Sequence, residues 1–196
     1  MALAARKKLR KSARKDPTTL EDEVAQALYD LEVNNKNLKP SLQSLYINTA
    51  KQVEIGNNKR AVVLFFPLRF IRKFHKIQKQ LVVELEKKFS GKMIVMIAQR
   101  KIARQPKSNI RTIQRSRALT NVHEAILTDI MYPVDIVGRR WRYKTDGSKQ
   151  SKVFIDAREK DKVESKLEGF STIYKKLTGK EVSFGFMTNP QLQQFL

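Results

Sequence analysis

The sequence contains no cysteine, which excludes disulfide bonds, thiolate zinc sites and cysteine nucleophiles. It contains only two histidines, His75 and His123, so a metal site built from several histidines is excluded as well. Long apolar runs are also missing. The longest ones, Ala61–Leu68 and Met93–Ala98, are far shorter than the roughly 20 residues that a bilayer-spanning helix needs. These absences predict a soluble protein with no metal site and no membrane partner.

Acidic residues are scarce relative to basic ones. The chain has 40 Lys and Arg against 19 Asp and Glu, which gives a formal net charge of +21 at pH 7. Self-repulsion on this scale opposes compaction unless a polyanion neutralises it. Nucleic acid is the first choice of polyanion, and an anionic membrane surface is the second. With 196 residues and a hydrophobic fraction of 41%, the chain still has enough apolar material for a folded core.

Lys and Arg concentrate first at the start of the chain and then in its middle. The start is rich in Arg and free of acidic residues, as mitochondrial transit peptides are, but we favour a disordered basic tail over residues 1–16 that settles onto a polyanion. The stretch 99–118 has no apolar periodicity and contains Pro106, so we expect a basic loop that faces RNA. The residues predicted to bind RNA in these two clusters are Arg6, Lys7, Lys8, Arg10, Lys11, Arg100, Lys101, Arg104, Lys107, Arg111, Arg115 and Arg117.

A third basic cluster lies in the sequence "GRRWRYK", which we expect to form a strand of a hairpin that turns at Asp146-Gly147. Alternation along the strand should place the aromatic Trp141 and Tyr143 on the face opposite to the neighbouring cations. We favour a place in the core for both aromatics, and base stacking is the alternative. The residues predicted to bind RNA in this cluster are Arg139, Arg140, Arg142 and Lys144.

A helix is predicted after Asp16-Pro17, in "TTLEDEVAQALYDLEV". Thr18 and Glu21 have the spacing of a capping box, and apolar residues recur at helical intervals after them. The outer face of this helix is acidic and is unlikely to point at phosphate. Two interpretations remain open: a solvated face that complements the helix dipole, or a contact with a basic neighbouring protein. The acidic residues of this face are Glu21, Asp22, Glu23, Asp30 and Glu32.

The rest of the chain predicts an α+β fold, with a mostly antiparallel sheet and packed helices. Two hairpins are each followed by an amphipathic helix, a glycine and a further strand, so the chain can hold two strand-strand-helix-strand units. The sequences "KKFSGKMIVMI" and "KKLTGKEVSFG" mark the helix end in each unit, although ordinary helix termination by glycine and lysine also explains this echo. We expect a single domain over residues 17–186 and a C-terminal tail over 187–196.

Enzymatic chemistry has little support in the sequence. Gly91-Lys92 and Gly179-Lys180 end helices and lack the following Ser or Thr of a phosphate-binding loop. His75 lies among surface cations, and His123 has no nucleophile or acid–base partner in a recognisable motif, so local hydrogen bonding is expected for it. We therefore predict no catalytic residue, no cofactor and no small-molecule substrate.

Several long segments resemble the eukaryotic small-subunit (40S) ribosomal protein seven family, which is distinct from the bacterial-type protein of the same number. The segments are "QKIQKQLVVELEKKFSGK", "IAQRKI", "RSRALTNVHEAILTDIMYPVDIVGRRWRYKTDGSK" and "FSTIYKKLTGKEVSFGF", and the resemblance covers about residues 20–186. It implies a non-enzymatic component of the cytoplasmic 40S subunit that contacts 18S rRNA and neighbouring ribosomal proteins. It also implies a role in small-subunit assembly, with a nucleolar stage and assembly factors as partners. A transient RNA-binding assembly factor or RNA chaperone is the alternative.

Overall fold

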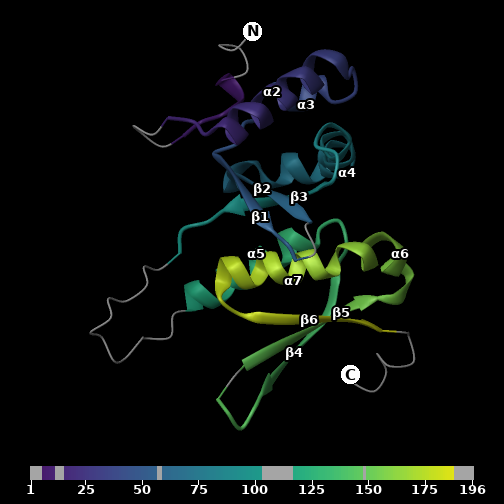
Figure 1. The fold of residues 1–196 in the computed structure, drawn as a ribbon. Helices are drawn as coiled ribbons and strands as arrows, with labels where there is room; N and C mark the ends of the chain where they lie inside the picture. The colour runs from purple at the N-terminus through teal and green to yellow at the C-terminus, as the bar shows by residue number, and fades with distance from the viewer. Residues whose placement is uncertain (1–5, 12–15, 57–58, 103–116, 148, 188–196) are drawn as a thin grey trace.

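The computed structural model describes residues 6–11, 16–56, 59–102, 117–147 and 149–187. The chain forms two units of the same strand order, with further helices before and between them (Figure 1). The first unit contains β1 (Thr49–Glu54), β2 (Arg60–Pro67), α4 (Ile71–Lys88) and β3 (Lys92–Gln99). The second contains β4 (Ile136–Tyr143), β5 (Lys149–Asp156), α7 (Leu167–Thr178) and β6 (Glu181–Met187).

The two units confirm the predicted strand-strand-helix-strand pattern and the α+β class. Within each unit the first two strands pair antiparallel as a hairpin, and the helical crossover then brings the third strand back parallel to the second. Each three-stranded sheet is therefore mixed, with as many parallel as antiparallel pairs, rather than mostly antiparallel. Gly91 and Gly179, at φ 76° and 71°, turn the chain between helix and strand in the left-handed conformation that glycine adopts without strain.

The remaining helices extend the two units. The N-terminal segment contains η1 (Arg6–Lys8), α2 (Thr19–Asn34) and α3 (Lys39–Leu42), and η2 (Leu68–Phe70) leads into α4. α5 (Arg117–Met131) connects the units, and η3 (Ala157–Glu159), α6 (Lys160–Val163) and η4 (Glu164–Lys166) lead into α7. The capping box that begins α2 is present, because Glu21 accepts from the Thr18 amide at 2.9 Å and its own amide donates back to the Thr18 hydroxyl.

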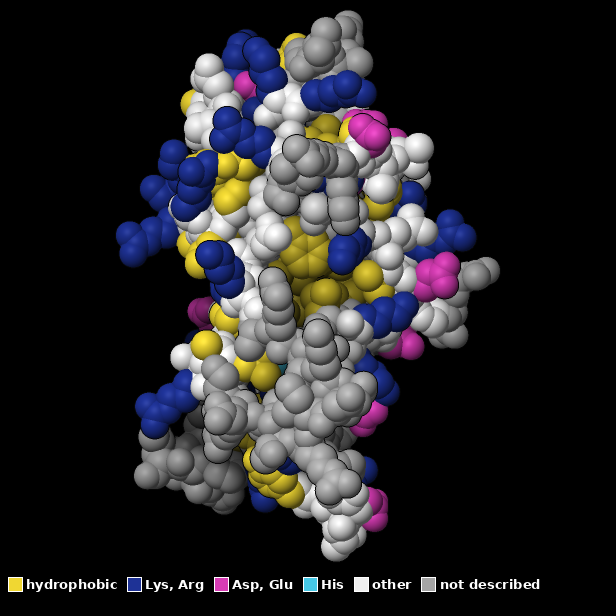
Figure 2. All heavy atoms as spheres, turned by 90° about the vertical axis from the view of Figure 1, so that its left-hand side faces the viewer, with side chains coloured by type: hydrophobic (Ala, Val, Ile, Leu, Met, Phe, Trp, Pro, Cys, Tyr) yellow, Lys and Arg dark blue, Asp and Glu magenta, His cyan; other side chains and the backbone are white. Residues whose placement is uncertain are grey.

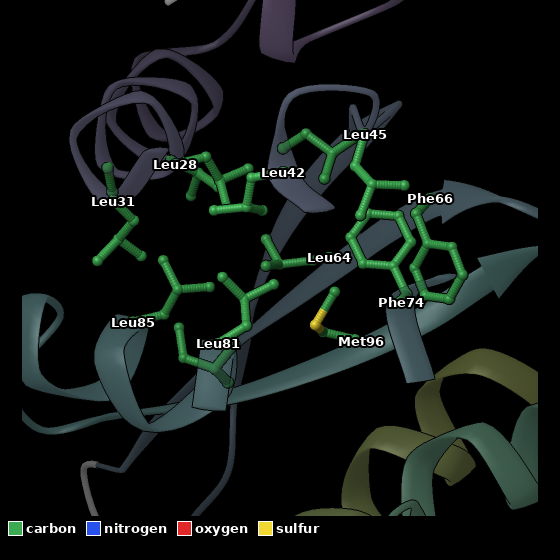
Figure 3. Close-up of a cluster of buried hydrophobic side chains, with 14 of the residues drawn as sticks. Leu28, Leu31, Leu42, Leu45, Leu64, Phe66, Phe74, Leu81, Leu85 and Met96 are labelled. Carbon is green, nitrogen blue, oxygen red and sulfur yellow. The ribbon is translucent and has the colours of Figure 1, made fainter. Parts of the chain in front are cut away.

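The elements stack in layers. α2 and α4 cover one face of the first sheet, and α5 and α7 lie between the two sheets. The second sheet is outermost, and none of the described helices packs on its outer face (Figure 1). In the first core, Leu81 and Leu85 of α4 point toward Leu64 and Met96 of the sheet (Figure 3). The second core combines α5 and α7 with buried residues of both sheets, such as Val63 and Val153. This shared core joins the two units.

The described part of the expected N-terminal tail differs from the prediction. Leu9 forms a parallel bridge with Ile47, and the two backbone bonds beside it, Arg10 N–H to the Ile47 carbonyl and Ile47 N–H to the Lys8 carbonyl, are both 2.8 Å long. Residues 6–11 are thus tied to the domain that they were expected to precede. The pairing was missed because it joins segments far apart in the sequence.

Candidate nucleic-acid interface

The predicted central loop contributes three described cations, and the structure separates them by environment. Arg104, Lys107, Arg111 and Arg115 lie outside the described residues. Arg100 was predicted to bind phosphate, but its side chain is only 12% exposed. Its guanidinium donates two hydrogen bonds, of 2.5 and 3.1 Å, to the carboxylate of Asp129 in α5. The guanidinium is therefore already paired with a carboxylate inside the fold, and its predicted phosphate contact stays a prediction. Lys101 and Arg117, at either end of the loop, are exposed.

The third cluster divides along the faces of β4. Arg139 points to the helix layer, where it lies 3.5 Å from the Glu124 carboxylate and donates to the Thr128 hydroxyl at 3.0 Å. The guanidinium of Arg139 is thus engaged by α5, although the residue remains exposed, and its predicted role in RNA binding stays a prediction. Arg140 and Arg142 are exposed on the opposite face, which is open. Their exposure leaves both guanidinium groups accessible to a phosphate.

Lys144 and the two aromatics of this cluster lie where the hairpin extends past the helix layer. Lys144 is exposed just beyond the end of β4. Trp141 and Tyr143 are on the face opposite Arg140, as alternation predicts, but they are 38% and 67% exposed rather than part of the core. Lys180 lies over the Trp141 ring at 5.5 Å. The favoured core prediction is wrong, because no helix reaches this end of the described sheet.

The N-terminal cluster is also divided. Lys8 is buried, with its ammonium 2.6 Å from both the Glu32 carboxylate and the Leu42 carbonyl. Lys11 is bound in the same way to Glu21, at 2.6 Å. These two lysines neutralise part of the acidic face of α2, and their predicted RNA contact stays a prediction. The exposed cations of this cluster are Arg6, Lys7 and Arg10.

The acidic face of α2 is therefore matched largely within the chain itself. Besides Glu21 and Glu32, Asp30 forms an ion pair with Lys88 of α4 at 2.8 Å. The hydrogen bond from Lys88 is the main reason that the pKa of Asp30 lies below its usual value. For these three carboxylates, neither of the two predicted interpretations holds, because the basic partner belongs to the same chain.

Sequence reasoning missed a basic surface on α4 and η2. Its exposed cations follow helical spacing, which was the signal available in the sequence. They are Arg69, Arg72, Lys73, Lys76 and Lys79. Figure 2 shows Lys and Arg side chains crowded along one edge of the upper half of the molecule. The opposite face of this helix packs in the core, as its predicted amphipathic pattern indicated.

Tyr46 lies at the border of this surface, between two guanidinium groups. Arg10 and Arg69 lie 5.1 and 5.5 Å from the centre of its ring. Partial burial raises the pKa of the Tyr46 hydroxyl, but hydrogen bonds from Arg10 and Arg69 outweigh burial and lower it overall. Such a cation–π arrangement keeps both arginines at the surface with their charge available.

The two histidines are structural in different ways. His75 stacks on Tyr132, with 4.2 Å between ring centroids, and the Tyr132 hydroxyl donates to the His75 carbonyl at 2.7 Å. His123 is 7% exposed, and its Nδ1 has no hydrogen-bond partner among the described residues, contrary to the expected local bonding. Burial, together with the nearby charge of Lys180, lowers the pKa of His123.

Two site types are missing from the part of the chain that the structure describes. No group of three or more His, Asp or Glu side chains there is arranged to hold a metal ion. No helix there is long and apolar enough to cross a membrane. What remains at the surface is a set of cations that no internal carboxylate occupies.

Comparison with known proteins identifies the family. Residues 8–186 match the family described as ribosomal protein S7e. The small ribosomal subunit protein eS7 of Avicennia marina is 50% identical over 183 residues, which cover 93% of this chain and 96% of the relative. Its counterpart in Schizosaccharomyces pombe is 46% identical over 187 residues, covering 94% and 96%. The chain therefore belongs to the ribosomal protein S7e family, a family of structural ribosomal proteins and not of enzymes.

Proposed function

We propose that this protein is a structural component of the small ribosomal subunit that binds 18S rRNA through its unoccupied surface cations. The names of its relatives and the net charge of +21 support this function. The observation that carries it is the separation of the cations into two groups, one bound to internal carboxylates and one exposed. The exposed residues retained from the sequence prediction are Arg6, Lys7, Arg10, Lys101, Arg117, Arg140, Arg142 and Lys144.

The same proposal includes neighbouring ribosomal proteins as permanent partners and assembly factors as transient ones. A chain with this charge associates with RNA early and holds its position by phosphate contacts, which carry little sequence information. Shape and adjacent proteins then supply the specificity. We accordingly propose that the protein joins the particle during assembly in the nucleolus and remains in the cytoplasmic subunit.

Sedimentation of an epitope-tagged copy tests the function. Cell lysate is separated on a gradient at low magnesium and moderately high salt, so that the two subunits migrate apart. We expect the tagged protein to co-migrate with the small subunit at one copy per particle. Migration with precursor particles alone would instead indicate the transient assembly factor, and a position at the top of the gradient would contradict both.

A salt titration tests the surface. Replacing Arg140, Arg142 and Lys144 together by Gln should make the log–log dependence of RNA affinity on salt shallower by about 2–3, since each lost phosphate contact removes about 0.7–0.9 from the slope. Lys87→Gln is the matched control, because Lys87 is exposed but already pairs with Glu84 at 2.8 Å. An unchanged slope in the triple variant would contradict the assignment of this surface.

A further inference from the structure

Within the described part of the chain, no helix packs on the outer face of the second sheet, whereas helices cover both faces of the first sheet (Figure 1). Alternation along β5 sends Val153 and Ile155 into the core, where both are 0% exposed. Lys152 and Phe154 point the other way, to the side on which no described helix packs (Figure 1). Phe154 is therefore a partly exposed aromatic on the central strand of an uncovered face.

Glycines lie on both sides of Phe154. Gly138 of β4 and Gly185 of β6 are its register partners on the two neighbouring strands. A Cβ atom on Gly138 would lie 3.8 Å from the ring, and one on Gly185 would lie 3.7 Å from it. Larger side chains at these two positions would lie against the ring and cover it. The two neighbouring strands thus place no side chain against the ring at these positions, and only the flexible side chain of Lys152 lies over it.

The surroundings of the ring are cationic. Lys152 lies 5.3 Å from the centre of the Phe154 ring. Together with Arg140 and Arg142, it lines a depression of about 360 Å³ on this face. The other lining residues are Gln150, Phe154, Ser183 and Phe184, so none of the described residues that line the depression is acidic. Among the described residues these three cations form no ion pair, in contrast to Arg139 on the other face.

We infer that this depression binds one unpaired nucleotide of RNA, with its base stacked on Phe154 and its phosphates beside Arg140 and Arg142. An aromatic ring stacks with any base, and the surrounding cations hold the backbone, as in other proteins that bind single strands. A base inside a duplex has no free face, so the ligand is a nucleotide in a loop, bulge or single-stranded segment. This inference rests on the proposed RNA-binding function and assigns a nucleotide class to one surface.

Photocrosslinking of the full chain tests the stacking directly. The probe is a single-stranded RNA of about twelve nucleotides in which uridines are replaced by 5-iodouridine, a base that crosslinks to aromatic rings in stacking contact. After irradiation and digestion, mass spectrometry should find the adduct on Phe154. Adducts confined to Trp141 or Tyr143, on the opposite face, would overturn the inference.

Equilibrium binding provides the second measurement. Phe154→Leu keeps an apolar side chain but removes the ring, so affinity for the single strand should fall about tenfold, with an unchanged salt slope and little change for a duplex of the same length. Phe89→Leu is the matched control. The Lys92 ammonium lies 5.8 Å from the centre of the Phe89 ring, but this ring is at the end of α4 and not in the proposed site. Thermal melts of both variants verify that they fold.

The outcomes separate this inference from the proposed function. If wild-type protein binds RNA with a steep salt slope but Phe154→Leu binds the single strand as tightly as wild type, the nucleotide site is wrong and the function stands. An equal loss for single strand and duplex also overturns the site. If wild-type protein has no salt-dependent affinity for either RNA, the proposed function itself fails.

Discussion

At the scale of single residues, Asp129 of α5 connects its helix to β3 and to the start of the basic loop. Its carboxylate accepts from the backbone amide of Ala98 at 3.0 Å and from both terminal nitrogens of Arg100, and its side chain is only 4% exposed. It thereby fixes the end of β3 against α5, at the point where the basic loop leaves the sheet. A buried carboxylate with three donors is stable only while its cation remains.

Removing one partner of this pair should therefore be costly. We expect Asp129→Ala to lower the free energy of unfolding by about 3–5 kcal/mol, because Arg100 is left buried without a counter-charge. The double variant Arg100→Met, Asp129→Leu should recover most of that loss, since apolar groups can fill the same space. Urea unfolding measures both. A single variant as stable as wild type would show that the pair is not formed.

His123 should make stability depend on pH in a window of its own. Its pKa is lowered from 6.5 by burial, so below pH 6.5 the unfolded chain takes up a proton that the folded chain does not. The free energy of unfolding should then fall as pH decreases from about 6.5, until the lowered pKa is reached. The pKa values of Glu21 and Asp30 are also lowered, but these two carboxylates change the free energy of unfolding only below their usual pKa values of 4.5 and 3.8.

Unfolding by urea near pH 7.5 and near pH 5.5 measures this dependence. His123→Gln should remove most of the loss between the two conditions, and His75→Gln should retain it. The two histidines are a matched pair because both lie on helices, but only His123 is buried. A wild-type stability that is equal at both values would contradict the burial of a neutral imidazole.

At the scale of elements, local periodicity could be predicted from the sequence and partners far along the chain could not. The amphipathic character of α4 was predicted because its apolar positions repeat within one helix, and its buried face includes Phe74, Leu81 and Leu85. The internal ion pairs of Arg100 and Lys8 were missed because the carboxylates that bind them lie 29 and 24 positions away, on helices whose direction the sequence does not give. Charge alone does not reveal whether a cation faces solvent or a carboxylate.

The contact between η1 and α2 allows a test with adjacent lysines. Lys8→Ala should lower the free energy of unfolding by about 1–3 kcal/mol, because the Leu42 carbonyl and the Glu32 carboxylate lose their buried donor. Lys7→Ala, at an exposed neighbouring position, should leave stability within about 0.5 kcal/mol of wild type. Chemical denaturation compares the two. Equal effects would mean that residues 6–11 do not hold α2.

At the scale of the whole molecule, internal pairing concentrates the positive charge outside. Ten ion pairs among the described residues each use a different carboxylate, so at least ten of the 19 acidic residues are occupied. The cations left over include those of the N-terminal segment, of α4, of the outer face of the second sheet and of the ends of the central loop. Composition predicted a polyanion partner, but only the folded arrangement distinguishes the cations available to it.

The shared second core should make the two units unfold together. Ile173 of α7 is 0% exposed in a cluster that includes Val63 of the first sheet and Val153 of the second. We expect Ile173→Ala to cost about 2–5 kcal/mol and to reduce hydrogen-exchange protection in both sheets alike. Loss of protection confined to β5 and β6 would show that the units are independently stable.

The place of α7 near the end of the chain also has a consequence for synthesis. The first sheet is complete once Gln99 has been made. One of its faces is covered only by the later helices α5 and α7, and this face includes Ala61, Val63 and Ile97. At about 5–20 residues per second, translation as far as Thr178 takes several more seconds. During that interval the nascent chain carries an uncovered apolar sheet, and it is in this period that a chaperone at the exit of the translating ribosome would have the most to protect.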